Sequence, residues 1–125
     1  MLSTTLKFIR VTPEHFNTPG GYTGIILPIM GTKVVALLHC NADAEEAFEM
    51  ELKKLVETSL LDEGCIKYEL YQYQHETCHY IIIEEWQSEQ ALAKHREAPH
   101  YKHFGRVAPV LLAAQPQIKV LERLV

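Results

Sequence analysis

The pattern of hydrophobic and polar positions changes near residue 32. Proline and glycine gather before that point, at Pro13, Pro19, Gly20, Gly21, Gly24, Pro28 and Gly31. Such a density of helix breakers excludes a long helix, so we expect two short extended runs, residues 5–11 and 24–30, and a turn in the glycine-rich run GGYTG at residues 20–24. We therefore predict an N-terminal extension over residues 1–32 and one folded domain over residues 33–125.

The first regular element is an apolar, β-branched run, residues 33–40 (KVVALLHC), which is typical of a buried strand. A helix should follow, because apolar positions then recur at helical spacing. These positions are Ala44, Phe48, Leu52, Leu55, Val56 and Ser59. Asp43 with Glu46 predicts a capping box at the start of this helix. Gly64 is placed to end it.

A hairpin is predicted next, since the strand-like runs 65–74 (CIKYELYQYQ) and 78–86 (CHYIIIEEW) flank a short polar turn. Large apolar side chains occupy both sides of the second run: Tyr80, Ile82 and Trp86 on one, Ile81 and Ile83 on the other. Helices can cover only one face of the sheet. The other face also needs cover, so we predict a homodimer.

The last third of the chain predicts two helical stretches and a strand. Ser88 can cap a short helix that Pro99 should end. Residues 100–114 form the second stretch, with a kink or break expected at Pro109. Residues 117–124 make the last strand. The order β-α-β-β-α-β predicts an α+β, ferredoxin-like sandwich.

Composition narrows the class of protein without naming a reaction. Twelve Lys and Arg against sixteen Asp and Glu give a net charge of −4 over 125 residues, which argues against nucleic acid as the main partner. The most apolar stretch, residues 24–38, is interrupted by Pro28 and Lys33, so we expect no membrane span. Three cysteines without a CxxC pattern indicate a reducing compartment, and we expect a cytoplasmic protein.

Three segments together resemble the antibiotic-biosynthesis-monooxygenase family. The first is residues 63–70 (EGCIKYEL), similar to the family's turn from helix to strand. The second is residues 84–86 (EEW), similar to its E-x-W motif. The third is His95 followed by Pro99 and His100, which resembles its H-x-x-x-P-H motif. The resemblance covers about residues 33–125 and does not extend to the N-terminal extension.

The resemblance implies a dimeric α+β barrel and an oxygenase that uses neither metal nor organic cofactor. Its substrate would be a small hydroquinone-like or polyphenolic aromatic compound, oxidised by O₂. The same family also includes enzymes that isomerise or degrade small oxygenated metabolites. A non-oxidative enzyme and a dimeric barrel that only holds a ligand therefore stay open as alternatives.

Two residues are the candidate catalytic pair. Glu84 shares a strand face with Trp86, and the resemblance places that face toward the helices. A buried carboxylate needs a partner. We expect this partner to be His95, whose pKa Glu84 would raise and whose tautomer it would fix, as a general base requires. The alternative is that Glu84 bonds to the backbone or to an arginine and that His95 only fills the pocket.

Three further residues are candidates for contact with the substrate. Tyr68 is either a phenol that lines a cavity or a core aromatic residue, and Trp86 either packs in the core or faces a flat substrate. His100 either caps the next helical turn or enters the pocket. We assign no metal ligand. Two histidines with Glu84 could form a two-histidine, one-carboxylate site, but Pro99 separates the histidines, so they do not share one helical face.

Overall fold

A computed structural model describes residues 8–11, 25–28 and 31–125, which fall into two compact units, Met1–Met30 and Gly31–Val125. In the first unit, β1 (Phe8–Val11) pairs antiparallel with β2 (Ile25–Pro28). Both strands lie within the extended runs that the sequence predicts. The predicted glycine-rich turn at residues 20–24 lies outside the described residues.

The second unit has an α+β, ferredoxin-like fold. Its four strands are β3 (Thr32–His39), β4 (Cys65–Gln72), β5 (His79–Trp86) and β6 (Gln117–Leu121). They form one antiparallel sheet in the order β4-β5-β3-β6. The helices are α1 (Glu45–Ser59), α2 (Glu89–Glu97) and α3 (Pro99–Leu111), and a short 3-10 turn, Ala42–Ala44, precedes α1.

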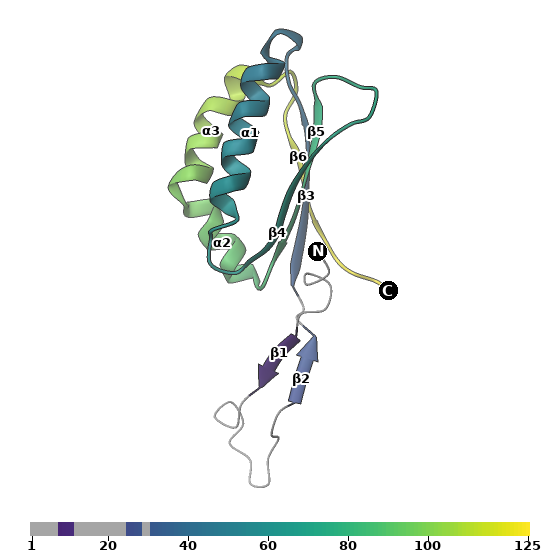
Figure 1. Ribbon diagram of the computed structural model, residues 1–125, viewed down its shortest axis with the longest axis vertical. Helices are drawn as coiled ribbons and strands as arrows, with labels where there is room; N and C mark the ends of the chain where they lie inside the picture. The colour runs from purple at the N-terminus through teal and green to yellow at the C-terminus, as the bar shows by residue number, and fades with distance from the viewer. Residues whose placement is uncertain (1–7, 12–24, 29–30) are drawn as a thin grey trace. The chain divides into compact units, whose positions relative to one another are not determined.

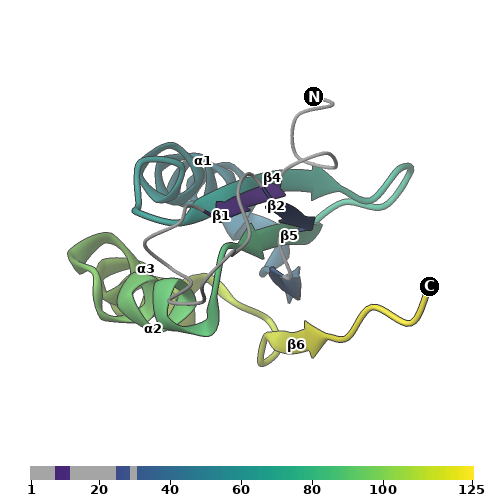
Figure 2. The ribbon, with the colours of Figure 1, turned by 90° about the horizontal axis from the view of Figure 1, so that it is seen from below.

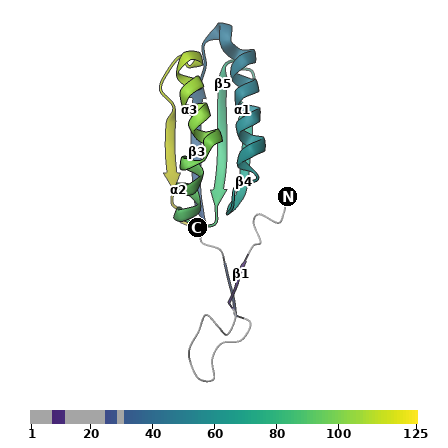
Figure 3. The ribbon, with the colours of Figure 1, turned by 90° about the vertical axis from the view of Figure 1, so that its left-hand side faces the viewer.

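All three helices of this unit lie on one face of the sheet (Figures 1 and 2). Figure 3 shows the domain from the helix side. In this view α1 and α3 run in front of the strands, and β6 lies at one edge of the sheet. The alternation of buried and half-buried residues along β5 shows that every second side chain enters the core. On α1 the predicted apolar face is confirmed, since Phe48, Leu52, Leu55 and Ser59 are buried.

The start of α1 departs from the sequence prediction, and the start of α2 agrees with it. The capping box of Asp43 and Glu46 is wrong, because the 3-10 turn comes first and Ala44, which has no capping side chain, precedes α1. Ser88 does cap α2, where its hydroxyl accepts the amide N–H of Ala91 at 3.1 Å. Pro99 is the first residue of α3, a position where a missing N–H costs nothing.

The turn between α1 and β4 positions a side chain of the candidate site. Gly64 has φ = 83°, a left-handed conformation that favours glycine. The helix itself ends earlier, at Ser59 with Leu60 as its C-cap, so Gly64 forms the turn into β4 and is not the predicted helix end. Its carbonyl accepts the amide of Gln87 at 2.8 Å, and the amide of Cys65 donates to the carbonyl of Asp62 at 3.1 Å. These bonds hold Asp62 at the end of the sheet, near α2.

The sheet face away from the helices has an apolar centre that is incompletely covered. Ile81 and Ile83 of β5 are half-buried, and every residue of β6 is exposed. This is the face for which the sequence predicts a second subunit, and the homodimer stays a prediction. Among the described residues, no helix has the length and hydropathy that crossing a bilayer requires.

Candidate active site

A cavity of about 190 Å³ lies between the sheet and the helices. Most of its wall is apolar, with side chains that include Ala36, Leu38, Ile82, Leu55, Phe104 and Ala108. Four side chains with polar groups also line it: Tyr68 from β4, Glu84 from β5, Arg96 from α2 and Tyr101 from α3. An apolar pocket with a few convergent polar groups is the usual form of a small-molecule site.

Glu84 is a buried carboxyl group in this wall, and the structure gives it a different partner from the one predicted. The indole Nε1–H of Trp86 donates to Glu84 Oε1 at 2.8 Å. Burial raises the pKa of Glu84, while the Trp86 hydrogen bond and the nearby Arg96 charge lower it by less. The predicted pairing of Glu84 with His95 is therefore wrong, because the neighbouring indole two residues along the same strand face takes that position.

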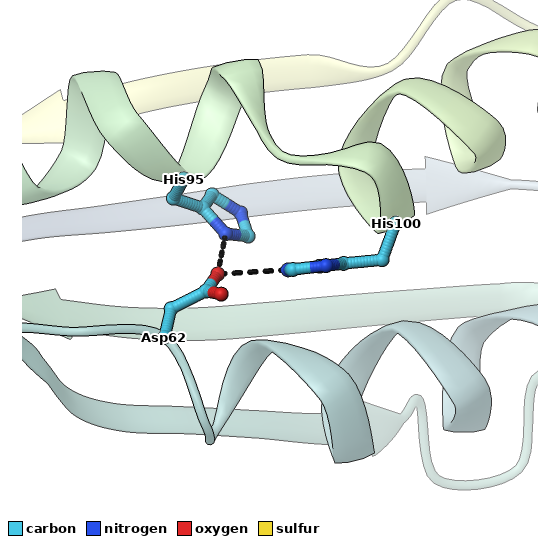
Figure 4. Close-up of side chains that lie close together, drawn as sticks. All are labelled: Asp62, His95 and His100. Atoms are coloured by element: carbon cyan, nitrogen blue, oxygen red, sulfur yellow. Dashed lines mark hydrogen bonds and ion pairs between the residues drawn. The ribbon is translucent and has the colours of Figure 1, made fainter.

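His95 is buried in the last turn of α2, and its partner is Asp62 (Figure 4). Its Nδ1 lies 2.8 Å from Asp62 Oδ2. A carboxylate only accepts, so Nδ1 carries the proton and Nε2 is left as the basic nitrogen. Nε2 is buried and has no hydrogen-bond partner within the described chain. Burial lowers the pKa of His95, and Asp62 opposes that shift without reversing it, so the predicted rise is also wrong.

His100 approaches the same carboxylate from the first turn of α3. Its Nε2 lies 2.8 Å from Asp62 Oδ2, so one oxygen atom bridges the two imidazole rings. The side chains of His100 and Asp62 are 22% and 18% exposed, whereas the His95 side chain is fully buried. The bridge therefore runs from the protein interior to the surface.

Three aromatic rings pack around the imidazole of His95. The centroid of its ring lies 4.5 Å from that of Trp86, 4.9 Å from that of Tyr101 and 5.4 Å from that of Tyr68. Tyr68 and Tyr101 also line the cavity, whereas His95 does not, so His95 stands directly behind this part of the wall. Burial, and then the Glu84 charge, raises the pKa of Tyr68, which keeps its phenol protonated.

The structure divides the five candidate residues into three groups. Tyr68 and Glu84 line the cavity, His95 and Trp86 pack behind its wall, and His100 contacts Asp62. Sequence reasoning missed Asp62, Arg96 and Tyr101. Asp62 lies two residues before Gly64 of the helix-to-strand turn, and the other two each adjoin a candidate histidine. A search of the positions beside the motifs could therefore have found all three.

The buried carboxyl group leads to a prediction about stability. We expect Glu84→Gln to raise the free energy of unfolding at neutral pH by about 1 kcal/mol, because it removes a buried charge and keeps an acceptor for Trp86. The folded-state pKa of Glu84 is raised, so its stability contribution is full below its usual value of 4.5 and is lost as pH rises through the folded-state value. The gain should therefore be small near pH 4 and larger near pH 7.

Urea unfolding followed by the fluorescence of Trp86, the single tryptophan of the chain, measures this gain. Glu85→Gln is the matched control, since Glu85 points to the other sheet face and pairs with Lys33 at 3.5 Å. Equal gains at both pH values, or a gain in the control, would contradict a burial effect at Glu84.

Comparison with known proteins defines the class to which this fold and site belong. The family model described as antibiotic biosynthesis monooxygenase matches residues 32–107. The chain belongs to this family.

Individual proteins and solved structures are also similar to this chain. The crystal structure of PA3566 from Pseudomonas aeruginosa is 31% identical, with a TM-score of 0.72 over 77% of this chain and 96% of that one. YcnE of Bacillus subtilis, which carries a provisional monooxygenase assignment, is 29% identical over 63% of this chain and 83% of its own length. The uncharacterised protein sll1783 of Synechocystis is 31% identical over 70% of this chain, and the match spans 59% of its length. The family, and the monooxygenase assignment that YcnE carries, agree with the resemblance seen in the sequence.

Proposed function

We propose that this protein is an oxygenase that needs neither metal nor organic cofactor. It would oxidise a small, electron-rich phenolic or hydroquinone-like compound with O₂ in the cavity between sheet and helices. One observation carries the proposal: the buried His95 is fixed by Asp62 through Nδ1, its Nε2 has no partner among the described residues, and its ring packs against Tyr101 and Tyr68, which line the cavity. A base in this tautomer can accept a proton inside an apolar site.

The proposed reaction draws its electrons from the substrate. A base removes a proton from a hydroxyl group or an activated C–H group, and the resulting anion passes one electron to O₂. The radical pair recombines to a hydroperoxide, which loses water and leaves a new carbonyl group. For a hydroquinone, the sum is hydroquinone plus O₂ to hydroxyquinone plus water. Substrate carbon is oxidised by four electrons in total, and O₂ is reduced by the same four.

The residues take different parts in this proposal. His95 acts as the base, and Asp62, in place of Glu84, is its positioning residue. Tyr68 supplies a phenolic donor to the ring oxygen of the substrate, since its raised pKa keeps it protonated. Trp86 and His100 act by holding Glu84 and Asp62. Glu84 lines the cavity with a raised pKa, which makes it the competing candidate for the base.

Oxygen uptake by metal-free protein against hydroquinones and anthrones tests the proposal. We expect uptake above autoxidation, and a loss of at least tenfold in His95→Ala, which corresponds to about 1.4 kcal/mol of barrier. Glu84→Gln is the matched comparison, because a large loss there with little loss in His95→Ala would move the base to Glu84. A visible absorption band that copurifies with the protein would contradict the cofactor-free reaction.

The alternatives give different results in the same assay. Product formation that does not consume oxygen would favour an isomerising or degrading enzyme. Binding without any product would favour a barrel that only holds a ligand. We also propose that a second copy covers the apolar sheet face around Ile81 and Ile83, and light scattering that reports a monomer would contradict this.

A further inference from the structure

Three side chains of the types that bind metal ions converge at one end of the sheet. Asp62 comes from the turn after α1, His95 from the end of α2 and His100 from the start of α3. One ligand atom from each lies within 4.8 Å of the others. Figure 4 shows both rings directed at the carboxylate. Two imidazoles with one carboxylate suit divalent ions such as Zn²⁺, Co²⁺ and Fe²⁺.

The interruption between α2 and α3, just before Pro99, makes this convergence possible. On a single continuous helix, positions 95 and 100 would not share one face, which is why the sequence argues against a histidine metal site. Ala98 has an extended conformation with ψ = 149°, so α3 starts in a new direction. His100 therefore returns toward Asp62 from a second helix, and the carboxylate comes from Asp62 rather than from Glu84.

The site is partly open to solvent, and its ligand side chains have room to adjust to an ion. Zinc lies about 2.0–2.1 Å from imidazole nitrogen, so tetrahedral ligand atoms lie roughly 3.3 Å apart. The two nitrogens each lie 2.8 Å from Asp62 Oδ2, and binding must open these distances by roughly half an ångström. Asp62 and His100 are partly exposed, so they can make this movement and leave a fourth position for water.

We propose that Asp62, His95 and His100 bind one divalent transition-metal ion of the zinc type. The ion would replace the two hydrogen bonds to Asp62 by three coordinate bonds. Coordination at Nδ1 of His95 moves the ring proton to Nε2, because a neutral imidazole carries only one. If the proposed function is right, the bound ion therefore inhibits the enzyme by removing its base.

Co²⁺ added to the chelator-treated full-length protein tests the site. We expect one equivalent to bind, with visible d–d absorption, and to quench the fluorescence of Trp86, whose ring lies 4.5 Å from that of His95. Zn²⁺ should displace the Co²⁺ and restore the fluorescence. His100→Ala should weaken binding at least tenfold without disturbing the core, because His100 is partly exposed.

His103→Ala is the matched control, since His103 lies one turn further along α3 and faces Glu51 at 3.4 Å. It should bind Co²⁺ as the wild type does. His39→Gln tests a second close imidazole pair among the described residues, the stacked rings of His39 and His79. Unchanged binding in His100→Ala, or binding lost in His39→Gln alone, would overturn the proposal.

The metal site and the proposed function can fail separately. An absence of Co²⁺ binding overturns the site whatever the oxygen uptake. Binding that depends on His100, together with oxygen uptake that Zn²⁺ does not inhibit, supports the site and contradicts His95 as the base. Stimulation of uptake by Fe²⁺ would overturn the inhibitory part.

Discussion

Asp62→Asn should lower the turnover of any substrate that the wild-type protein oxidises by roughly a hundredfold or more. The Asp62 carboxylate accepts from Nδ1 of His95 at 2.8 Å and from His100 at the same distance. An asparagine amide is neutral and can present a donor to Nδ1, which would place the ring proton on Nε2 and block the base. It also removes the charge that stabilises the imidazolium formed when His95 takes up a proton.

Nitrogen NMR of the imidazole rings reports the tautomer of His95. A purely structural role of Asp62 would leave this tautomer unchanged. The wild type should show the Nδ1–H tautomer of His95, and Asp62→Asn should lose it. Glu63→Gln is the matched control, because Glu63 adjoins Asp62 in the same turn and makes an exposed ion pair with Lys94 at 3.0 Å. A wild-type His95 with its proton on Nε2 would contradict the orientation inferred here, even before a substrate is known.

Gly64→Ala should lower the free energy of unfolding by about 2–4 kcal/mol. Gly64 has φ = 83°, which an L side chain adopts only with strain. A Cβ atom there would lie 2.5 Å from Cβ of Ala91, a contact that forces the turn or α2 to move. Asp62 is part of this turn, so the tautomer signal of His95 should weaken together with the stability. Urea unfolding followed by Trp86 fluorescence measures the loss.

Two further variants separate the backbone strain at residue 64 from the steric contact with Ala91. Gly105→Ala is the control, because a Cβ at Gly105, in the middle of α3, meets nothing within 4 Å. It should raise the free energy of unfolding by about 0.5–1 kcal/mol. In an Ala91→Gly background, Gly64→Ala should cost less than in the wild type, since the clash is gone and only the strain remains. An equal cost in both backgrounds would assign the whole effect to the backbone.

Local patterns predicted the elements of this domain well. The alternation along β5 and the helical spacing on α1 correspond to the buried faces that the structure shows. The Ser88 cap and the turn at Gly64 were identified because their effects arise from the backbone within a few residues, although α1 ends earlier, at Ser59. The capping box failed because the chain forms a 3-10 turn at Ala42–Ala44 before the helix begins. A sequence motif does not show which turn comes first.

The sequence by itself determined the fold class and drew attention to His95, His100, Tyr68, Trp86 and Glu84. It could not assign their partners. Asp62 lies 33 positions before His95, and the two meet only because the turn at Gly64 packs beside α2. Glu84 accepts a hydrogen bond from Trp86 because both side chains point to the same face of one strand. His95 instead pairs with the carboxylate of Asp62. Side-chain partners depend on how remote segments pack, and packing is decided by the whole core rather than by local spacing.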